Sequence, residues 1–338
     1  MYKYLRDNYH FHLLLIIFSF GFVLFYGFRG VYPIDSFIIF NSGYSVINGY
    51  HPFKDYWSIS GPILDYFQAI FFLLFGLNWI SYILHSLIIN IIVVSVSFYF
   101  FQKLKINNYY SFLYSLSIAI LAYPQTGTPF MDHHAFYFSY LSIILFSLGI
   151  LNNKKIFWCL APIALFISFF SKQLPSSYLL TLLIFFLAFY LLNNKDKAPV
   201  TVKGLLIGTS ISIFIFLTWI ILADISFENI LTQYIYYPLE IGDTRIGKIK
   251  FDINSFFLQF KFIYLALLIP LFFFIKNFKQ EIKLRGFPFY FFILNIILFL
   301  SFIFSQIITK NQILIFFLIP YFLAVSHYFL KIYRGKSI

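Results

Sequence analysis

Long apolar runs separated by short charged segments repeat along the whole chain. Most runs approach the roughly 20 residues that an α-helix needs to cross a hydrocarbon core about 30 Å thick. Helices are the expected spanning form, because a helix satisfies its own backbone hydrogen bonds within lipid. The pattern predicts an all-α integral membrane protein with about ten transmembrane helices. The expected spans are residues 11–28, 80–102, 109–123, 134–151, 156–170, 178–192, 204–223, 256–275, 287–307 and 312–330.

The composition requires a non-aqueous solvent for most of the chain. Of the 338 residues, 61% are hydrophobic, 24% are aromatic and only 11% are charged. A soluble domain carries about 25% charged residues. We therefore expect residues 1–338 to form a single polytopic membrane domain surrounded by membrane lipids.

The net charge of +12 does not indicate a nucleic-acid partner, because Lys and Arg lie in short loops between apolar runs. Their distribution instead predicts orientation, since basic residues concentrate in cytoplasmic loops. With both termini in the cytoplasm, most Lys and Arg residues are cytoplasmic and most Asp and Glu residues lie on the opposite face. Lys3 and Arg6 precede a first span that no small-residue cleavage site follows, which favours a retained signal anchor.

Two of the outer loops are long, at about 29–79 and 224–255. Catalytic and binding residues concentrate on such loops, so we expect function on this face. In the first loop, residues 36–47 and 63–75 have the length and apolar character of interfacial helices. If 63–75 instead crossed the membrane, every later orientation would invert and the basic-loop pattern would be lost.

Three motifs in the first half of the chain resemble a known superfamily. They are Asp35 followed by NGYHPFKDYWSISGPILDYFQAIFFLLFG (48–76), TPFMDHHAF (128–136) and FFSKQLPSSY (169–178). Together they resemble the GT-C glycosyltransferases, notably relatives of protein O-mannosyltransferases and lipid A aminoarabinose transferases. The chain departs from that pattern at Ser36, where related families often carry Glu after the Asp.

The resemblance implies a glycosyltransferase in the bacterial inner (cytoplasmic) membrane. Such an enzyme moves a sugar from a polyprenyl-phosphate donor to a glycan, lipid or protein acceptor on the periplasmic face. The acceptor hydroxyl must lose a proton to a carboxylate base, and by the motif match Asp35 is that base in an inverting reaction. The alternative role of Asp35 is to cap the helix expected after it.

Asp132 is the second candidate catalytic carboxylate, with His133 and His134 beside it. A divalent metal, Mg²⁺ or Mn²⁺, could be held by Asp35, Asp132 and His133, or His133, His134 and Asp55 could orient the acceptor. Adjacent helical residues point about 100° apart, so at most one of the two His residues joins Asp132. The alternative to a functional role is that these three polar residues simply mark the start of a membrane span.

Four residues are candidates for the donor phosphate, because a departing phosphate needs positive or hydrogen-bonding groups. Lys172 and Gln173 follow an apolar run at the outer face, where an unpaired Lys is costly. Lys54 and Arg245 are weaker candidates of the same kind. The alternative for Lys172 is an interfacial side chain that snorkels to water.

Two further interpretations of the chain remain open. A polytopic transporter or lipid-carrier flippase would show ionisable residues near mid-membrane, broken helices and internal repeats, and the sequence shows no convincing repeat between its halves. A non-catalytic membrane subunit would keep the fold without the chemistry, and Ser36 leaves room for it. The transferase interpretation predicts that Asp35, Asp132 and Lys172 converge on one cavity open to lipid.

Overall fold

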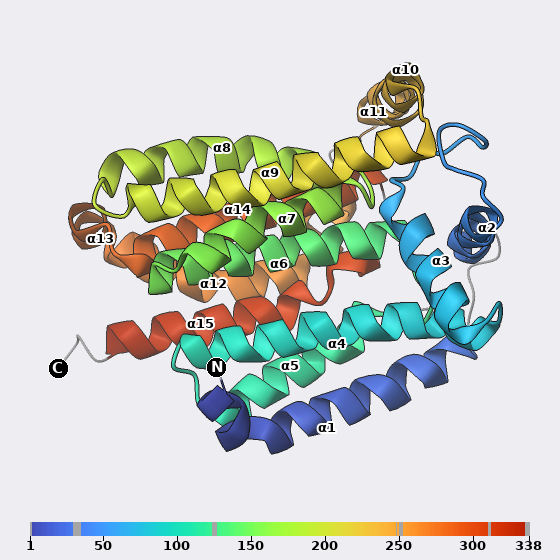
Figure 1. Ribbon diagram of the computed structural model, residues 1–338. Helices are drawn as coiled ribbons and strands as arrows, with labels where there is room; N and C mark the ends of the chain where they lie inside the picture. Colours follow the sequence, from blue (N-terminus) through green and yellow to red (C-terminus); the bar gives the residue numbers. More distant parts are fainter. Residues whose placement is uncertain are drawn as a thin grey trace.

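A computed structural model describes residues 2–29, 35–123, 127–247, 249, 253–309 and 312–334, and every regular element among them is a helix. The helices pack into one elongated bundle (Figure 1). In chain order they are α1 (Tyr2–Gly27), α2 (Asp35–Ile47), α3 (Ile63–Phe75), α4 (Trp79–Lys103), α5 (Asn108–Ala122), α6 (Met131–Asn152), α7 (Lys155–Phe169), α8 (Ser176–Asn193), α9 (Ala198–Ala223), α10 (Phe227–Ile230), η1 (Leu231–Tyr236), α11 (Tyr237–Ile246), η2 (Asn254–Leu258), α12 (Lys261–Lys276), α13 (Phe278–Leu284), α14 (Phe287–Thr309), η3 (Gln312–Ile315) and α15 (Leu318–Arg334).

Six of the described helices are long and apolar enough to cross a membrane. They are α1 from Tyr9, α4, α6, α8, α9 and α14, and α12 with α13 would make a seventh if this pair, bent by 76°, is one span. The multi-pass helical character is therefore confirmed. Each predicted span overlaps a helix, but α5, α7, α12 and α15 have only 15 to 17 residues, so ten crossings remain a prediction.

Helix α6 forms the centre of the bundle. It packs against α4, α7 and α14, and 89% of its most apolar 18-residue window is buried. A helix that is apolar on all sides belongs in such a position. Its buried hydroxyls are satisfied by α7, because Ser139 Oγ lies 2.7 Å from Ser168 Oγ and Ser142 donates to Ala161 O at 2.9 Å. Helix α9 lies at the periphery, with only 11% of its window buried.

Glycines bring α7 and α9 into close contact. A Cβ at Gly208 would collide with the backbone carbonyl of Cys159, and one at Gly204 would meet Lys155 O at 2.8 Å. Small residues allow this approach between helices in a membrane, where packing is a main source of association. The N-terminal halves of α7 and α9 are therefore in close contact.

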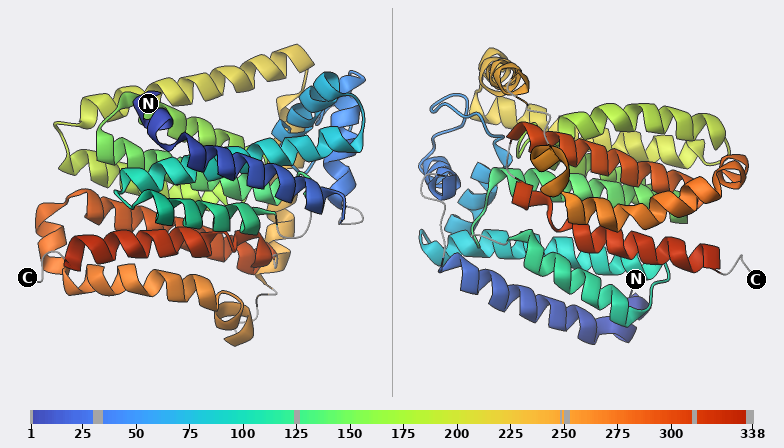
Figure 2. Two further views of the ribbon diagram at one scale, coloured as in Figure 1. Left: turned by 90° about the horizontal axis from the view of Figure 1, so that it is seen from below. Right: turned by 180° about the vertical axis from the view of Figure 1, so that it is seen from behind.

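The two long segments that were expected on the outer face meet at one end of the bundle. Helices α2 and α3 lie there beside α10 and α11, while α1 begins and α15 ends at the opposite end (Figures 1 and 2). The first loop is tied to the second, because Asn229 Nδ2 donates to Phe53 O at 2.9 Å. Ser58 N also donates to Gln233 Oε1 at 3.0 Å. An interfacial position for α2 and α3 remains a prediction.

The α7–α9 contact gives a first testable prediction. Gly208→Ala should lower the stability of the protein by about 1–3 kcal/mol, because the new methyl group has no space against α7. The matched control is Gly21→Ala in α1, where a Cβ meets nothing within 4 Å and the better helix propensity of Ala stabilises. Thermal unfolding of the purified variants in one detergent measures both effects. Equal melting temperatures for the two variants would contradict the close contact.

Candidate functional site

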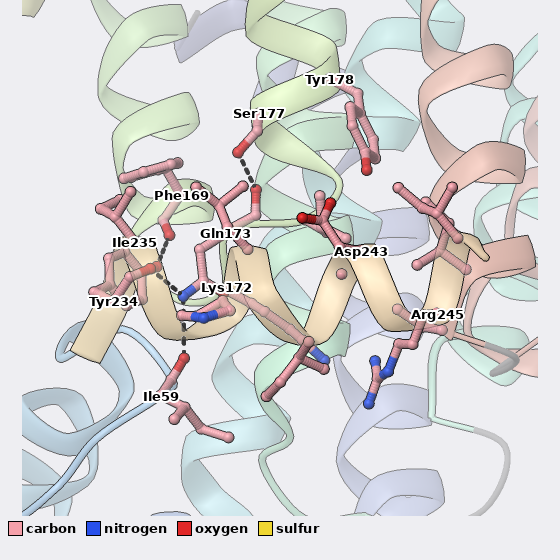
Figure 3. A pocket seen from close by; sticks show the side chains of 18 of the residues that line it. Ile59, Phe169, Lys172, Gln173, Ser177, Tyr178, Tyr234, Ile235, Asp243 and Arg245 are labelled. Carbon is pink, nitrogen blue, oxygen red and sulfur yellow. Dashed lines mark hydrogen bonds between the residues drawn. The ribbon is translucent and has the colours of Figure 1, made fainter. Parts of the chain in front are cut away.

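A cavity of about 340 Å³ lies at the end of the bundle where the long outer segments meet. Its wall is contributed by the first loop, the start of α6, the α7–α8 turn, the segment from Tyr234 to Ile246 and the end of α14 (Figure 3). Most of the lining is apolar, and the charged lining residues are Lys172, Asp243 and Arg245. The cavity thus combines a hydrocarbon surface with a few charges, as a site for an amphiphilic ligand requires.

Lys172 and Asp132 form an ion pair at the wall of this cavity. The ammonium of Lys172 lies 2.7 Å from each carboxylate oxygen of Asp132, whose side chain is only 3% exposed. Asp132 stands in the first turn of α6, where the helix dipole favours an anion, and Lys172 follows the end of α7. An ammonium has three N–H donors, so Lys172 retains one donor beyond the two that Asp132 accepts.

Gln173 connects three segments behind the cavity. Its Nε2 donates to Ile59 O at 3.1 Å and to Tyr234 O at 2.8 Å (Figure 3). Gly61 holds the same loop closer still, since its N–H donates to Ser171 O at 3.1 Å and a Cβ there would collide with the backbone of Phe170. Gln173 therefore fixes the wall of the site through its amide donors.

The second long segment contributes the outer wall. Tyr234 lies in the π-helix η1, and its hydroxyl donates to the carbonyl of Phe169. Such π-helical turns are frequent at functional sites. Asp243 and Arg245 come from the following helix α11 and are exposed (Figure 3). The structure thus places Arg245 on the wall of the cavity that Lys172 and Gln173 also line.

Two predicted site residues lie elsewhere and have partners of their own. Lys54, expected at the donor phosphate, pairs with Asp224 at 3.1 Å and donates to Ala223 O at 3.3 Å, at the end of α9. Asp55, expected near the acceptor, accepts the backbone N–H of His51 at 2.7 Å. Neither residue lines the cavity.

The two predicted histidines are fully buried within the bundle and do not line the cavity. His134 Nδ1 lies 3.0 Å from Phe130 O, and its ring meets that of His85 at a centroid distance of 4.9 Å. The ring of His133 stacks on that of Tyr137. The sequence predicted that at most one of the two histidines joins Asp132, and helical geometry directs both rings towards other aromatic side chains.

The predicted metal site has no support among the described residues. No group of three or more His, Cys, Asp and Glu side chains there could hold an ion. Both oxygens of Asp132 already accept from Lys172, so a metal at Asp132 would have to displace the ammonium. The side chain of Asp35 lies outside the described part, and a Mg²⁺ or Mn²⁺ site made with it and His133 stays a prediction.

Asp35 is the first residue of α2. One turn later, Ile39 packs in a cluster with Leu64, Tyr82 and Met131. Since Met131 lines the cavity and precedes Asp132, the start of α6 lies close to the early turns of α2. Contact of the Asp35 carboxylate with Asp132 or Lys172 stays a prediction.

A buried carboxylate that sequence reasoning did not select stands on α3, outside the candidate spans. Asp65 is 2% exposed, and it accepts hydrogen bonds from Ser42 at 2.6 Å and from Tyr56 at 2.8 Å. Burial raises the pKa of Asp65 to about 7, and the two hydrogen bonds oppose that shift. The one signal in the sequence that could have indicated Asp65 was its spacing from Gln68. The two polar residues lie three apart, on one face of an otherwise apolar helix.

Comparison with known proteins provides no relative for the chain. No protein-family model, no curated protein and no solved structure matches it. The function must therefore be argued from the cavity and its charges.

The Lys172–Asp132 pair can be tested by a double-mutant cycle. Lys172→Met should destabilise the protein by about 3–5 kcal/mol, because it leaves a buried carboxylate without its partner. Adding Asp132→Leu should recover most of that loss, since no unpaired charge then remains. Unfolding midpoints of the two single variants and the double variant measure the coupling. Additive effects of the two substitutions would rule out the pair.

Asp65 predicts a dependence of stability on pH. With its pKa raised from 3.8 to about 7, the folded protein binds more protons than the unfolded chain between these values. Its contribution to stability is therefore largest below about pH 4 and declines as pH rises towards 7. Asp65→Asn should lack this decline, whereas the exposed control Asp196→Asn should keep it. Melting temperatures measured from pH 4 to 8 test this expectation. Parallel pH profiles for the wild type and Asp65→Asn would contradict the raised pKa of Asp65.

Proposed function

We propose that the protein is a glycosyltransferase that moves a sugar from a polyprenyl-phosphate donor to an acceptor on the periplasmic face of the bacterial inner membrane. The observation that carries this proposal is the position of the Lys172 ammonium. It stands at the wall of a mainly apolar cavity, held by the buried carboxylate of Asp132. The GT-C resemblance of the first half of the chain supports the same activity.

The cavity suits the phosphate of an amphiphilic donor. The remaining N–H of Lys172 and the guanidinium of Arg245 supply the donors that a departing phosphate needs. Asp243 on the same wall and Asp132 behind it balance these two cations, so the site favours a singly charged phosphodiester over a multiply charged anion. Phe169, Ile235 and Leu239 provide apolar surface beside the charges.

The chemistry proposed is a single displacement with inversion. The bond between the anomeric carbon and the phosphate oxygen breaks, and the acceptor hydroxyl oxygen bonds to the same carbon. The hydroxyl proton passes to a carboxylate, and the lipid leaves as a phosphate monoester. Asp35 is the proposed base, as the motif implies. Asp132 is a positioning residue, because both of its oxygens hold Lys172 in place.

The decisive experiment removes the protein from its cell and compares surface glycans and lipid-linked intermediates. Loss of a transferase should leave a terminal sugar missing while its polyprenyl-phosphate donor accumulates. A flippase would instead leave the lipid-linked intermediate on the cytoplasmic leaflet, and unchanged glycans with unchanged donor would reject the transferase.

Purified variants test the residues assigned. Lys172→Met should lower kcat about 10²–10³-fold, the range typical of losing one group that stabilises a departing anion. Asp35→Asn should abolish transfer without affecting membrane insertion. Lys261→Met, at an exposed position outside the cavity, is the matched control for loss of a lysine. Full activity of Asp35→Asn would remove Asp35 from the mechanism.

A further inference from the structure

The buried carboxylate of Asp65 joins three parts of the first long loop. One of its oxygens accepts from Ser42 of α2 and the other from Tyr56 in the connection between α2 and α3. Both donors are neutral hydroxyls, and the ion pairs of the described residues give Asp65 no basic partner. A buried carboxylate without a counter-charge is costly, and such groups are more typical of functional sites than of a stabilising core.

Helix α2 lies directly against α3 beside this carboxylate. A Cβ at Gly43, the residue after Ser42, would lie 2.6 Å from Cγ of Gln68, so the two helices touch there. Gln68 also connects α3 to the candidate span α4, since its Oε1 lies 3.0 Å from His85 Nδ1. Asp65 and Gln68 lie three residues apart on one face of α3, and this face therefore holds α2 on the bundle.

The contact at Ser42 determines where α2 begins. Asp35 is the first residue of this 13-residue helix, and position 35 precedes Ser42 by seven residues, which is about two turns along one face. Between them, Ile39 is buried in a cluster with Met131, the residue before Asp132. A displacement of α2 at Ser42 therefore moves its first residue relative to the start of α6.

The Ser42 hydroxyl has two acceptors within reach. Its Oγ lies 2.6 Å from Asp65 Oδ1 and 3.3 Å from Ile39 O in its own helix, and a hydroxyl has one hydrogen to donate. Ionised Asp65 is the stronger acceptor, because hydrogen bonds to a charged group are shorter and stronger. When Asp65 is protonated, its own O–H donates to Ser42 Oγ and the Ser42 hydrogen turns to Ile39 O. The link between α2 and α3 is then an ordinary neutral hydrogen bond.

The titratable side chains that the charge of Asp65 reaches are three phenols, Tyr56 of the loop, Tyr66 of α3 and Tyr82 of α4. Asp55 acts on Tyr56, and His51 Nδ1 lies 2.8 Å from the Tyr66 hydroxyl, but neither residue is hydrogen-bonded to Asp65. Burial raises the pKa of Asp65 to about 7, whereas a phenol ordinarily loses its proton near pH 10. The charge of Asp65 therefore changes near neutral pH while the phenols around it stay neutral.

We propose that Asp65 is a positioning residue whose ionised carboxylate holds α2, and with it the proposed base Asp35, so that transfer is faster above neutral pH than below it. The role of Asp35 rests on the proposed function, but the hold on α2 does not. A purely structural role predicts the opposite pH dependence. The contribution of Asp65 to stability declines as pH rises towards 7, so an activity that rises over the same range does not follow from stability.

Hydrogen exchange of the full-length protein in lipid nanodiscs tests the hold on α2 without any substrate. Ser42→Ala and Asp65→Asn should each lower the protection of amides 39–47 roughly tenfold at pH 8, the effect of losing one hydrogen bond to a charged group. Ser45→Ala is the matched control, because the Ser45 hydroxyl donates to Asn41 O within α2, and it should leave protection unchanged. Equal protection in Ser42→Ala and Ser45→Ala would overturn the proposal.

Sugar transfer tests the consequence for activity. Purified protein is added to detergent-permeabilised membranes of cells that lack it, which supply the accumulated donor and the acceptor together. Between about pH 5.5 and 8.5 the wild-type rate should rise roughly tenfold, as a small displacement of a reacting group suffices for such a change. Asp65→Asn should lack this rise and stay near the low-pH rate of the wild type. Ser42→Ala should be slowed roughly tenfold at pH 8, and Ser45→Ala should not.

Melting temperatures at each pH confirm that every variant is folded, and the wild-type profile requires no variant. A rise with pH in Asp65→Asn that matches the wild type would overturn the proposal. A wild-type rate that falls together with the melting temperature as pH rises would also overturn it, since a structural role predicts that result. If the wild type shows no transfer at any pH while Ser42→Ala still loses protection in α2, the transferase is rejected and the hold of Asp65 on α2 stands.

Discussion

The end of the bundle that holds the cavity depends on one buried carboxylate that needs a positive partner. Asp132 is almost fully removed from solvent, where an unpaired charge costs several kcal/mol. The ion pair with this carboxylate holds Lys172 in place, and therefore also the turn between α7 and α8. From that turn, Gln173 reaches the first loop and the segment at Tyr234. Through this turn, the ion pair thus helps to position both long segments that line the cavity.

The sequence predicted the helices well because lipid leaves a chain few alternatives. Apolar runs bounded by charge became helices throughout the described residues, whereas the number of crossings depends on lengths near the limit for spanning, as in α5 and α7. Lys172 and Gln173 were predictable from their position directly after an apolar run, whereas Arg245 was only a weaker candidate among the charges of the second long loop, 224–255. Asp65 was not recognised as a site of interest, because its partners Ser42 and Tyr56 belong to other elements. Lys54 lies away from the cavity and pairs with Asp224, and a partner 170 residues away could not be predicted from the sequence.

The balance of charges at the cavity favours selectivity over strong attraction. Lys172 and Arg245 are opposed by Asp132 and Asp243, so a ligand gains little from net charge and must instead match hydrogen-bond donors and apolar surface together. A membrane surface offers many anions to such a site. A match to both requirements at once would separate the proposed polyprenyl-phosphate donor from abundant phospholipid headgroups.

The docking of the first loop on later parts of the chain has a consequence for biogenesis. Ribosomes deliver the N-terminal part first, so the segment around Gly61 emerges well before Phe170, Ser171 and Gln173, and earlier still than Asn229 and Gln233. Until those later segments are inserted, the loop lacks the hydrogen-bond partners that they supply. The end of the molecule that carries the Lys172 cavity is thus completed only after α9 has been inserted, although Asp35, the proposed base, is translated among the first forty residues.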